Sequence, residues 1–217
     1  MAIISCIIAD DHEIFRQGIR NVLNRDHKLK CIGEAENGAT LLQLLQQHKP
    51  DVILLDMKMP EMDGVQATAT IKELYPTAKI LVLTMYDEEE MILHMLDMGV
   101  NGYLVKTASP AEILRAIHKV YEDDFYLSDL VGKLMLKSRQ QKSDIPLRHK
   151  KNVVLNDKEK EILRLMCKEL TTTEIGNAIH LSPRTVEGIR STLIDKLEVR
   201  NSTGLIIYAV KNGIADA

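Results

Sequence analysis

The chain has few of the residues that build secreted or metal-stapled proteins. It holds three cysteines in 217 residues, and they are scattered among apolar neighbours. No Cys or His lies at ligand spacing from another, which argues against a disulfide framework and a cysteine-based metal centre. We therefore expect Cys6, Cys31 and Cys167 to be buried thiols in a reducing cytosol.

Long apolar runs are missing as well. No stretch approaches the roughly 20 apolar residues that a membrane-spanning helix needs, and no basic segment precedes the apolar start at Met1. The chain also contains no internal repeat and no low-complexity segment. We therefore expect a cytoplasmic protein that makes no membrane contact.

A strong net charge is the third missing feature, because the formal charge is only -3. The charges are unevenly distributed, however. Residues 1–124 carry 12 basic and 20 acidic side chains, whereas residues 125–217 carry 16 basic and 11 acidic ones. This asymmetry predicts two domains with different partners, the more basic of which faces nucleic acid.

In residues 1–124, short apolar runs alternate five times with segments of helical period. The predicted strands cover residues 3–9, 29–35, 52–56, 79–84 and 102–105, and the predicted helices cover 12–24, 39–47, 65–75, 87–98 and 110–121. Strict alternation of this kind predicts an α/β fold. We expect a doubly wound, five-stranded parallel sheet with helices on both faces.

The rest of the chain has a different character. Residues 125–152 are predicted to be a linker, because most of this segment is rich in Lys, Arg, Gln and Ser. From residue 153 to 217 the period is helical, and two short helices around a His180-Leu181 turn predict a small all-α helix-turn-helix domain. Three helix starts carry capping signals: Asn156 with Glu159, Thr171 with Glu174, and Ser182-Pro183.

Polar side chains stand at the carboxyl ends of four predicted strands. They are Asp10, Asp11, Asp56, Thr84 and Lys106. In a doubly wound sheet these ends share one edge, so the side chains converge there. Three carboxylates repel one another unless a cation neutralises them, and oxygen ligands suit Mg²⁺. One carboxylate can then act as nucleophile, while the hydroxyl and the ammonium bind the oxygens of a phosphoryl group.

With these residues in view, the chain resembles a response regulator of two-component signalling, of the NarL/FixJ group with a LuxR-type DNA-binding domain. The resemblance covers nearly the whole length. It rests on Asp10-Asp11, Leu54-Leu55-Asp56-Met57, Met59-Pro60-Glu61-Met62-Asp63-Gly64, Leu83-Thr84, Gly102-Tyr103-Leu104-Val105-Lys106, and Leu181-Ser182-Pro183-Arg184-Thr185-Val186-Glu187.

The resemblance implies a flavodoxin-like receiver domain over residues 1–124 and a transcription regulator rather than an enzyme, apart from its own phosphoryl transfer and dephosphorylation. Asp56 would accept phosphate from a sensor histidine kinase. Asp10, Asp11, Asp56 and the backbone carbonyl of Lys58 would hold Mg²⁺. Thr84 and Lys106 would bind the phosphoryl group, Tyr103 would report it by rotating inward, and the activated protein would bind promoter DNA as a homodimer.

A helical wheel of the second predicted helix of the helix-turn-helix places Val186, Ile189, Leu193 and Leu197 on one face. The opposite face would enter the major groove. The resemblance implies base contacts for Glu187, Gly188 and Ser191. The predicted DNA contacts are Arg184, Thr185, Glu187, Gly188, Arg190, Ser191, Lys196 and Arg200. Four of them are expected to anchor DNA phosphates: Arg184, Arg190, Lys196 and Arg200. The last helix, with Leu205, Ile206 and Tyr208, is predicted to form the dimer contact, and packing within the domain is the competing interpretation.

Two alternatives share the first domain's pattern. An aspartyl-phosphate phosphatase of the haloacid dehalogenase type also uses Mg²⁺ and a nucleophilic Asp, but it needs a second Asp two residues later, where this chain has Lys58. A flavodoxin-like FMN carrier needs a phosphate-cradling loop after the first strand. Here that loop holds Asp10-Asp11-His12-Glu13, which would repel phosphate.

Overall fold

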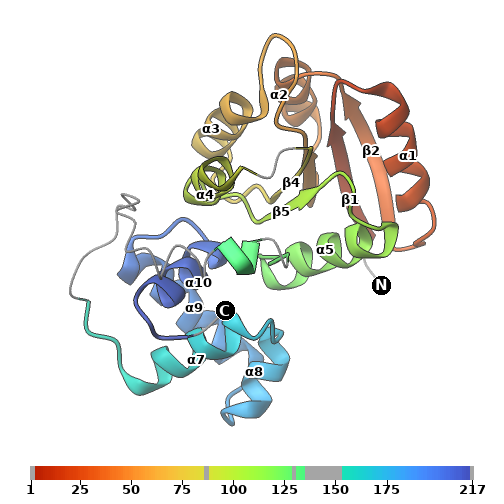
Figure 1. Cartoon of the computed structure of the whole chain (residues 1–217). Helices are drawn as coiled ribbons and strands as arrows, with labels where there is room; N and C mark the ends of the chain where they lie inside the picture. The colour runs from red at the N-terminus through yellow and green to blue at the C-terminus, as the bar shows by residue number, and fades with distance from the viewer. Residues whose placement is uncertain (1–2, 86–87, 129–130, 135–152, 216–217) are drawn as a thin grey trace. The chain divides into compact units, whose positions relative to one another are not determined.

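The computed structural model describes residues 3–85, 88–128, 131–134 and 153–215. The chain divides into two compact units, Met1–Tyr121 and Glu122–Ala217, and each has its own architecture. The first unit contains the sheet, and the second is helical (Figure 1).

The first unit is a five-stranded parallel sheet in the order β2-β1-β3-β4-β5. Its strands are β1 (Ile4–Ala9), β2 (Leu29–Ala35), β3 (Val52–Leu55), β4 (Ile80–Thr84) and β5 (Gly102–Val105). Its helices are α1 (Glu13–Leu23), α2 (Gly38–Gln47), α3 (Gly64–Leu74), α4 (Glu89–Asp97) and α5 (Pro110–Asp123), which ends in the second unit.

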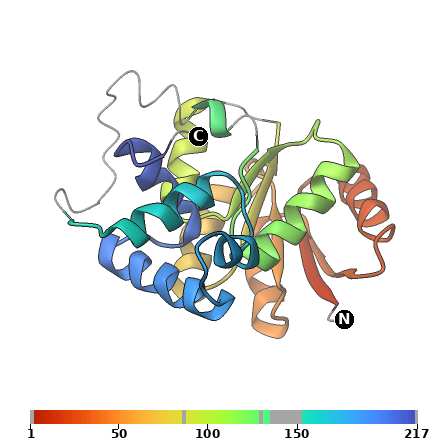
Figure 2. The same cartoon turned by 90° about the horizontal axis from the view of Figure 1, so that it is seen from below.

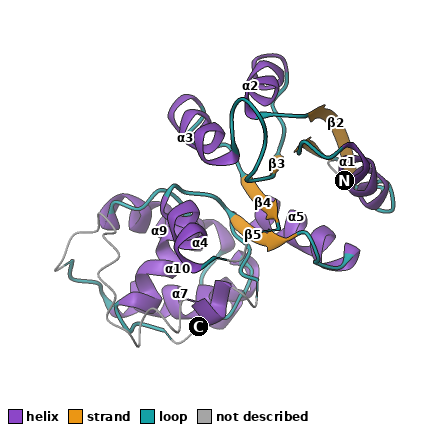
Figure 3. Cartoon of the chain, turned by 45° about the horizontal axis from the view of Figure 1, so that its top comes forward, coloured by secondary structure: helices purple, strands orange, loops and turns teal. Residues whose placement is uncertain are grey.

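The sheet is covered on both faces, as predicted. Helices α1 and α5 lie on one face, and α2, α3 and α4 lie on the other (Figures 1 and 3). Figure 2, seen from below, shows α5 (green) beside α1 (red). This double cover explains why β3 is a continuous apolar run: all four of its residues are buried.

The second unit contains α7 (Asp157–Cys167), α8 (Thr172–Ala178), α9 (Pro183–Leu197) and α10 (Ser202–Lys211). All three predicted capping signals are confirmed. Asn156 and Thr171 form complete capping boxes with Glu159 and Glu174, and the Ser182 side chain accepts from the backbone N–H of Thr185. Helices α8 and α9 pack against each other as the helix-turn-helix.

Of the predicted linker, residues 129–130 and 135–152 lie outside the described residues. Phe125, Tyr126 and Leu127, however, are 3%, 4% and 8% exposed, and they belong to the second unit. The polar composition of the later part of the segment had obscured this apolar start. No helix in the described part of the chain has the length and apolar character needed to cross a membrane.

Candidate functional site

The carboxyl ends of the strands bring the predicted acidic residues together. Ala9 pairs with Leu55 across β1 and β3, so Asp10 and Asp56, the next residue on each strand, emerge side by side. The backbone N–H of Asp56 donates to the carbonyl of Ala9 over 2.8 Å, which fixes the spacing. Both carboxylates are nearly buried, with 3% and 4% of their side-chain surface exposed.

Lys106 links the two carboxylates. Its Nζ lies 2.7 Å from Asp10 Oδ2 and 2.7 Å from Asp56 Oδ2, and 6% of the side chain is exposed. The ring of Phe15 lies beneath the ammonium, 4.7 Å from Nζ to its centroid. One cation therefore balances two buried anions, at the edge where the sequence predicted an acidic cluster.

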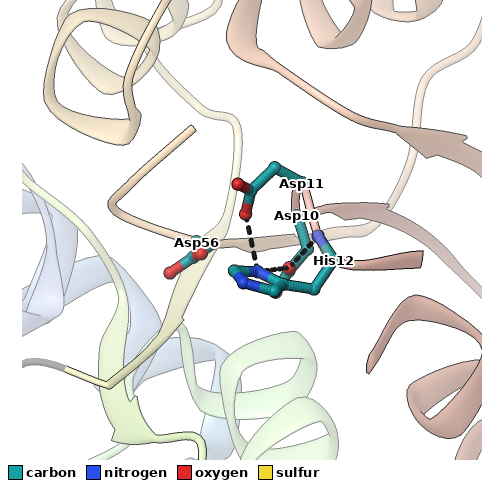
Figure 4. A group of neighbouring side chains, drawn as sticks. All are labelled: Asp10, Asp11, His12 and Asp56. Atoms are coloured by element: carbon teal, nitrogen blue, oxygen red, sulfur yellow. Dashed lines mark hydrogen bonds and ion pairs between the residues drawn. The ribbon is translucent and has the colours of Figure 1, made fainter. Parts of the chain in front are cut away.

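Asp11 and His12 complete the cluster (Figure 4). One ligand atom from each of Asp10, Asp11, His12 and Asp56 lies within 4.8 Å of all the others. His12 Nδ1 is 2.7 Å from Asp11 Oδ1 and 3.2 Å from Asp10 Oδ1. The three carboxylates offer the hard oxygen ligands that Mg²⁺ prefers, so the donor set fits that ion.

Burial and charge act in opposite directions on the two central groups. Burial raises the pKa of the Asp56 carboxyl, and the Asp10 charge adds to the rise, although the Lys106 hydrogen bond partly counters it. For Lys106, burial alone would lower the pKa, but hydrogen bonds to Asp10 and Asp56 outweigh it and the pKa is raised. The ammonium therefore stays charged between the carboxylates.

The Asp63-Gly64 pair positions the chain behind Asp56. Asp63 caps α3 in a capping box with Gln66, and the Gly64 N–H donates to the Met57 carbonyl over 2.9 Å. A Cβ atom on Gly64 would collide with the Asp56 carbonyl oxygen and lie 2.8 Å from Met57 Cα. The turn therefore requires glycine because of this close approach. Beside it is a cavity of about 550 Å³, lined by Asp11, Met57, Lys58, Met59, Pro60, Asp63, Val65, Glu88 and Met91.

The other predicted residues of this site lie at the neighbouring strand ends. Thr84 is fully buried at the end of β4, and its carbonyl accepts from the Lys106 N–H over 2.7 Å. Tyr103, on β5, is fully buried in this conformation. Lys58 is exposed at the rim of the cavity, where its backbone follows Asp56 by two residues.

The sequence did not reveal two residues that support the site. Arg16 donates from Nη1 to the Asp10 carbonyl over 2.6 Å and lies 3.4 Å from Glu34, so it holds the turn that carries Asp10 and Asp11. Phe15 contacts Lys106 as described above. Phe15 and Arg16 lie in the first turn of α1, a few residues after Asp10, and this spacing was the sequence signal for their contacts with the site. An amphipathic helix by itself, however, does not predict such contacts.

In the second unit, the exposed face of α9 carries most of the predicted DNA contacts. Arg184, Thr185, Glu187, Gly188 and Ser191 are exposed, as is Arg200 beyond the helix. A Cβ on Gly176 would lie 2.6 Å from the Leu181 carbonyl oxygen, so the turn into α9 passes directly over α8 at a glycine.

Arg190 is not on that face. It is 3% exposed, and its guanidinium donates to residues from four segments. The acceptors are Thr172 Oγ1 at 2.7 Å, Ser202 Oγ at 2.6 Å, Glu187 Oε2 at 3.0 Å and the Asp123 carbonyl. The predicted phosphate contact is therefore replaced here by interior hydrogen bonds. The sequence contained a signal for the burial of Arg190, though not for its acceptors, because Arg190 follows Val186 by four residues and so shares its apolar face.

Lys196 and the predicted dimer residues are also engaged within the chain. Lys196 Nζ lies 2.8 Å from both carboxylate oxygens of Glu159, which ties α9 to α7. Leu205 and Ile206 are fully buried and Tyr208 is 6% exposed, on a helix that packs against α7 and α9. Packing within the chain, the competing interpretation, therefore describes this conformation of α10.

Two family models match this chain, one in each of its two compact units. The family model described as "Response regulator receiver domain" matches residues 6–118. The model described as "Bacterial regulatory proteins, luxR family" matches residues 153–209.

Similar curated proteins cover almost the whole chain. Transcriptional regulatory protein DegU of Brevibacillus brevis is 30% identical, over 97% of this chain and 94% of that protein. Response regulator protein VraR of Staphylococcus saprophyticus is 34% identical, over 97% and 98%. A solved structure of the two-component response regulator RcsB in complex with DNA is also similar, with 27% identity, a TM-score of 0.59 and coverage of 96% of this chain and 98% of that one.

Proposed function

The chain belongs to the two-component response regulators that join a receiver domain to a luxR-type DNA-binding domain, and on this premise we propose that Asp56 is its phosphoryl acceptor. It is a DNA-binding transcription regulator, not a phosphatase or a flavin carrier. A receiver domain implies a histidine kinase as phosphoryl donor. The observation that carries the proposal is the placement of Asp56 beside Asp10, with Lys106 Nζ at 2.7 Å from both carboxylates.

In the proposed step, a carboxylate oxygen of Asp56 forms a bond to phosphorus. The bond from phosphorus to the histidine nitrogen of the kinase breaks, and its electron pair leaves with the imidazole. The hydrogen bond from Lys106 opposes the rise in the Asp56 pKa that burial causes, and its ammonium, 2.7 Å from the carboxylate, is close enough to receive a phosphoryl oxygen. Thr84, at the end of the neighbouring strand, supplies a hydroxyl to the phosphoryl group. Tyr103 responds to the phosphorylation of Asp56.

Receiver domains bind Mg²⁺ at an acidic pocket of this kind. Here Asp10, Asp11 and Asp56, with the backbone carbonyl of Lys58, would hold the ion. When bound, it neutralises charge on the phosphoryl oxygens. Lys106 and Thr84 perform the corresponding task from the chain itself.

The second half of the proposal concerns DNA. The exposed face of α9 would enter the major groove, with Glu187, Gly188 and Ser191 toward the bases and Arg184 and Arg200 toward phosphates. We place this activity in the cytoplasm. We also propose that phosphorylation promotes a homodimer, which doubles the contacts that a weakly charged domain makes with DNA. Residues 151–217 carry 10 basic and 9 acidic groups.

The test is labelling by a small acyl phosphate with Mg²⁺. The wild-type chain is expected to gain one acid-stable, base-labile phosphoryl group, and Asp56→Asn is expected to gain none. Asp97→Asn, which removes an exposed carboxylate from α4, is the matched control and should label normally. Equal labelling of Asp56→Asn and wild type would overturn the assignment.

A further inference from the structure

The carboxylate of Glu187 is held in one orientation by the buried Arg190. Glu187 is the fifth residue of α9 and so lies near its N-terminal end. In a helix-turn-helix, the residues at this end of the recognition helix contact base edges. Its Oε2 lies 3.0 Å from Arg190 Nη1, and 62% of its side chain remains exposed. The described residues give Oε1 no hydrogen bond. In this exposed side chain Oε2 is anchored to Arg190, and Oε1 is left as an acceptor.

Arg190 is a rigid anchor because its position does not depend on Glu187 alone. The guanidinium also donates to Thr172, Ser202 and the Asp123 carbonyl, at three separate points of the second unit. A planar guanidinium with acceptors on several sides cannot rotate without breaking buried hydrogen bonds. Its positive charge also offsets the carboxylate, which lowers the repulsion between Glu187 and the DNA phosphates.

The surface next to Glu187 permits a close approach. Gly188 is exposed, and a Cβ built there would meet nothing within 4 Å. Ser191, one turn further along the same face, adds a short side chain. A base edge can therefore come close to the outward oxygen of Glu187 without being blocked by a longer neighbour.

We propose that Glu187, oriented by Arg190, selects a cytosine at one position of each half-site by accepting a hydrogen bond from its N4 amino group. The proposal rests on the DNA-binding function proposed above. In the major groove, cytosine presents a donor without an acceptor beside it, whereas adenine places its N7 acceptor next to the amino group, where it repels a carboxylate. Guanine and thymine present acceptors there. Arg190 is a positioning residue in this scheme, not a phosphate contact.

Selection from a randomised duplex library tests the proposal. The full-length chain, treated with acetyl phosphate and Mg²⁺, is allowed to enrich its preferred sequences, and the base frequencies are compared between variants. Wild type is expected to favour cytosine at one position of the half-site by about tenfold. Glu187→Gln should shift that position toward adenine, because an amide can pair with both N6 and N7.

Asp195→Asn is the matched control. Asp195 is an exposed acid on the same helix, two turns beyond Glu187, and its substitution removes the same charge. Both variants should therefore bind DNA more tightly in general, but Asp195→Asn should leave the base frequencies unchanged.

Two further variants test the positioning role. Arg190→Lys keeps a positive charge but cannot hold four acceptors, and it should reduce the cytosine preference about tenfold while the other positions of the site stay as in wild type. If this variant does not fold, Glu187→Asp takes its place. The aspartate is exposed and one methylene shorter, so it cannot contact Arg190 and a base together, and the preference should fall equally.

The outcomes separate this inference from the function on which it rests. If wild type enriches no sequence, both are overturned. If it enriches a site, but Glu187→Gln and Asp195→Asn give the wild-type frequencies at every position, DNA binding stands and the reading role of Glu187 fails. If Glu187→Gln alters one position while Arg190→Lys or Glu187→Asp does not, the orientation by Arg190 is refuted.

Discussion

Gly64 shows how one hydrogen atom in place of a methyl group shapes the acidic site. The turn from β3 to α3 passes so close to Asp56 that a Cβ would overlap its carbonyl oxygen. We expect Gly64→Ala to lower the free energy of unfolding by about 1–3 kcal/mol, through overpacking, and to slow phosphorylation by displacing Asp56. Gly18→Ala is the control, because a Cβ there meets nothing within 4 Å. Similar melting temperatures and labelling rates for the two variants would refute this explanation.

Lys106 is the second residue whose loss is predictable. Without its ammonium, the carboxylates of Asp10 and Asp56 face each other nearly buried and uncompensated. The pKa of Asp56, already raised by burial, should rise further, so Lys106→Met should be labelled roughly 100-fold more slowly. The deficit should widen as the pH falls, because more Asp56 is then protonated.

The rate of labelling as a function of pH, with Lys30→Met as an exposed control, measures this effect. The Lys106 variant should also lose phosphate-dependent dimerisation in light scattering. A rate equal to that of the control at all pH values would contradict the role given to Lys106.

At the scale of elements, Glu159 joins two helices of the second unit. Its carboxylate closes the capping box of α7 and accepts from Lys196 of α9. Burial raises the pKa of Glu159, but hydrogen bonds from Lys196 and from the Asn156 backbone outweigh it, so that the pKa lies below its ordinary 4.5. The folded state thus binds this proton more weakly than the unfolded chain. The stabilisation is complete above that ordinary value and is lost as the pH falls through the lowered pKa.

Glu159→Gln is therefore expected to cost about 1–2 kcal/mol at neutral pH and to remove this part of the acid sensitivity. Calorimetric melting between neutral pH and pH values below the ordinary pKa compares the variant with wild type. The two curves should converge at the acid end. Parallel curves would show that the pair contributes no pH dependence.

The helices and strands themselves were largely predictable. The predicted strands 29–35 and 102–105 coincide with β2 and β5, and β1, β3 and β4 differ by one residue at one end. Burial on both faces of the sheet makes each strand a continuous apolar run, and glycines, prolines and capping residues mark the ends. The convergence of Asp10, Asp56 and Lys106 followed from the parallel topology alone.

The interior role of Arg190 was not predicted. A buried guanidinium is stable only where several acceptors surround it, and here they come from Asp123, Thr172, Glu187 and Ser202. Local patterns carry no information about acceptors so distant in the chain. The predicted phosphate contact was the usual expectation for an arginine on a recognition helix.

At the scale of the whole molecule, the second unit begins at Glu122, before the segment that the luxR-type match covers. Asp123 gives its carbonyl to Arg190 and its carboxylate to the Thr172 N–H, at 3.3 Å. We expect a fragment of residues 122–217 to be more stable than one of residues 153–217 by about 1–3 kcal/mol, because the shorter fragment leaves a buried donor unpaired. Equal urea midpoints for the two fragments would show that Asp123 contributes nothing.

The contact between Glu187 and Arg190 also has an evolutionary consequence. Among the described residues, Glu187 is the acid that pairs with the buried guanidinium of Arg190. A substitution of the base-contacting side chain at residue 187 therefore alters the interior of the domain as well as the DNA sequence that it prefers. Glutamine or aspartate at residue 187 would keep an acceptor near the Arg190 guanidinium, whereas lysine there would place two cations, its ammonium and the guanidinium, together. Across paralogues, we expect an acidic or amide side chain at residue 187 to be inherited with arginine at residue 190. A basic side chain at residue 187 is expected in lineages where that arginine was lost first. New promoter specificities in such a lineage would arise through paired substitutions.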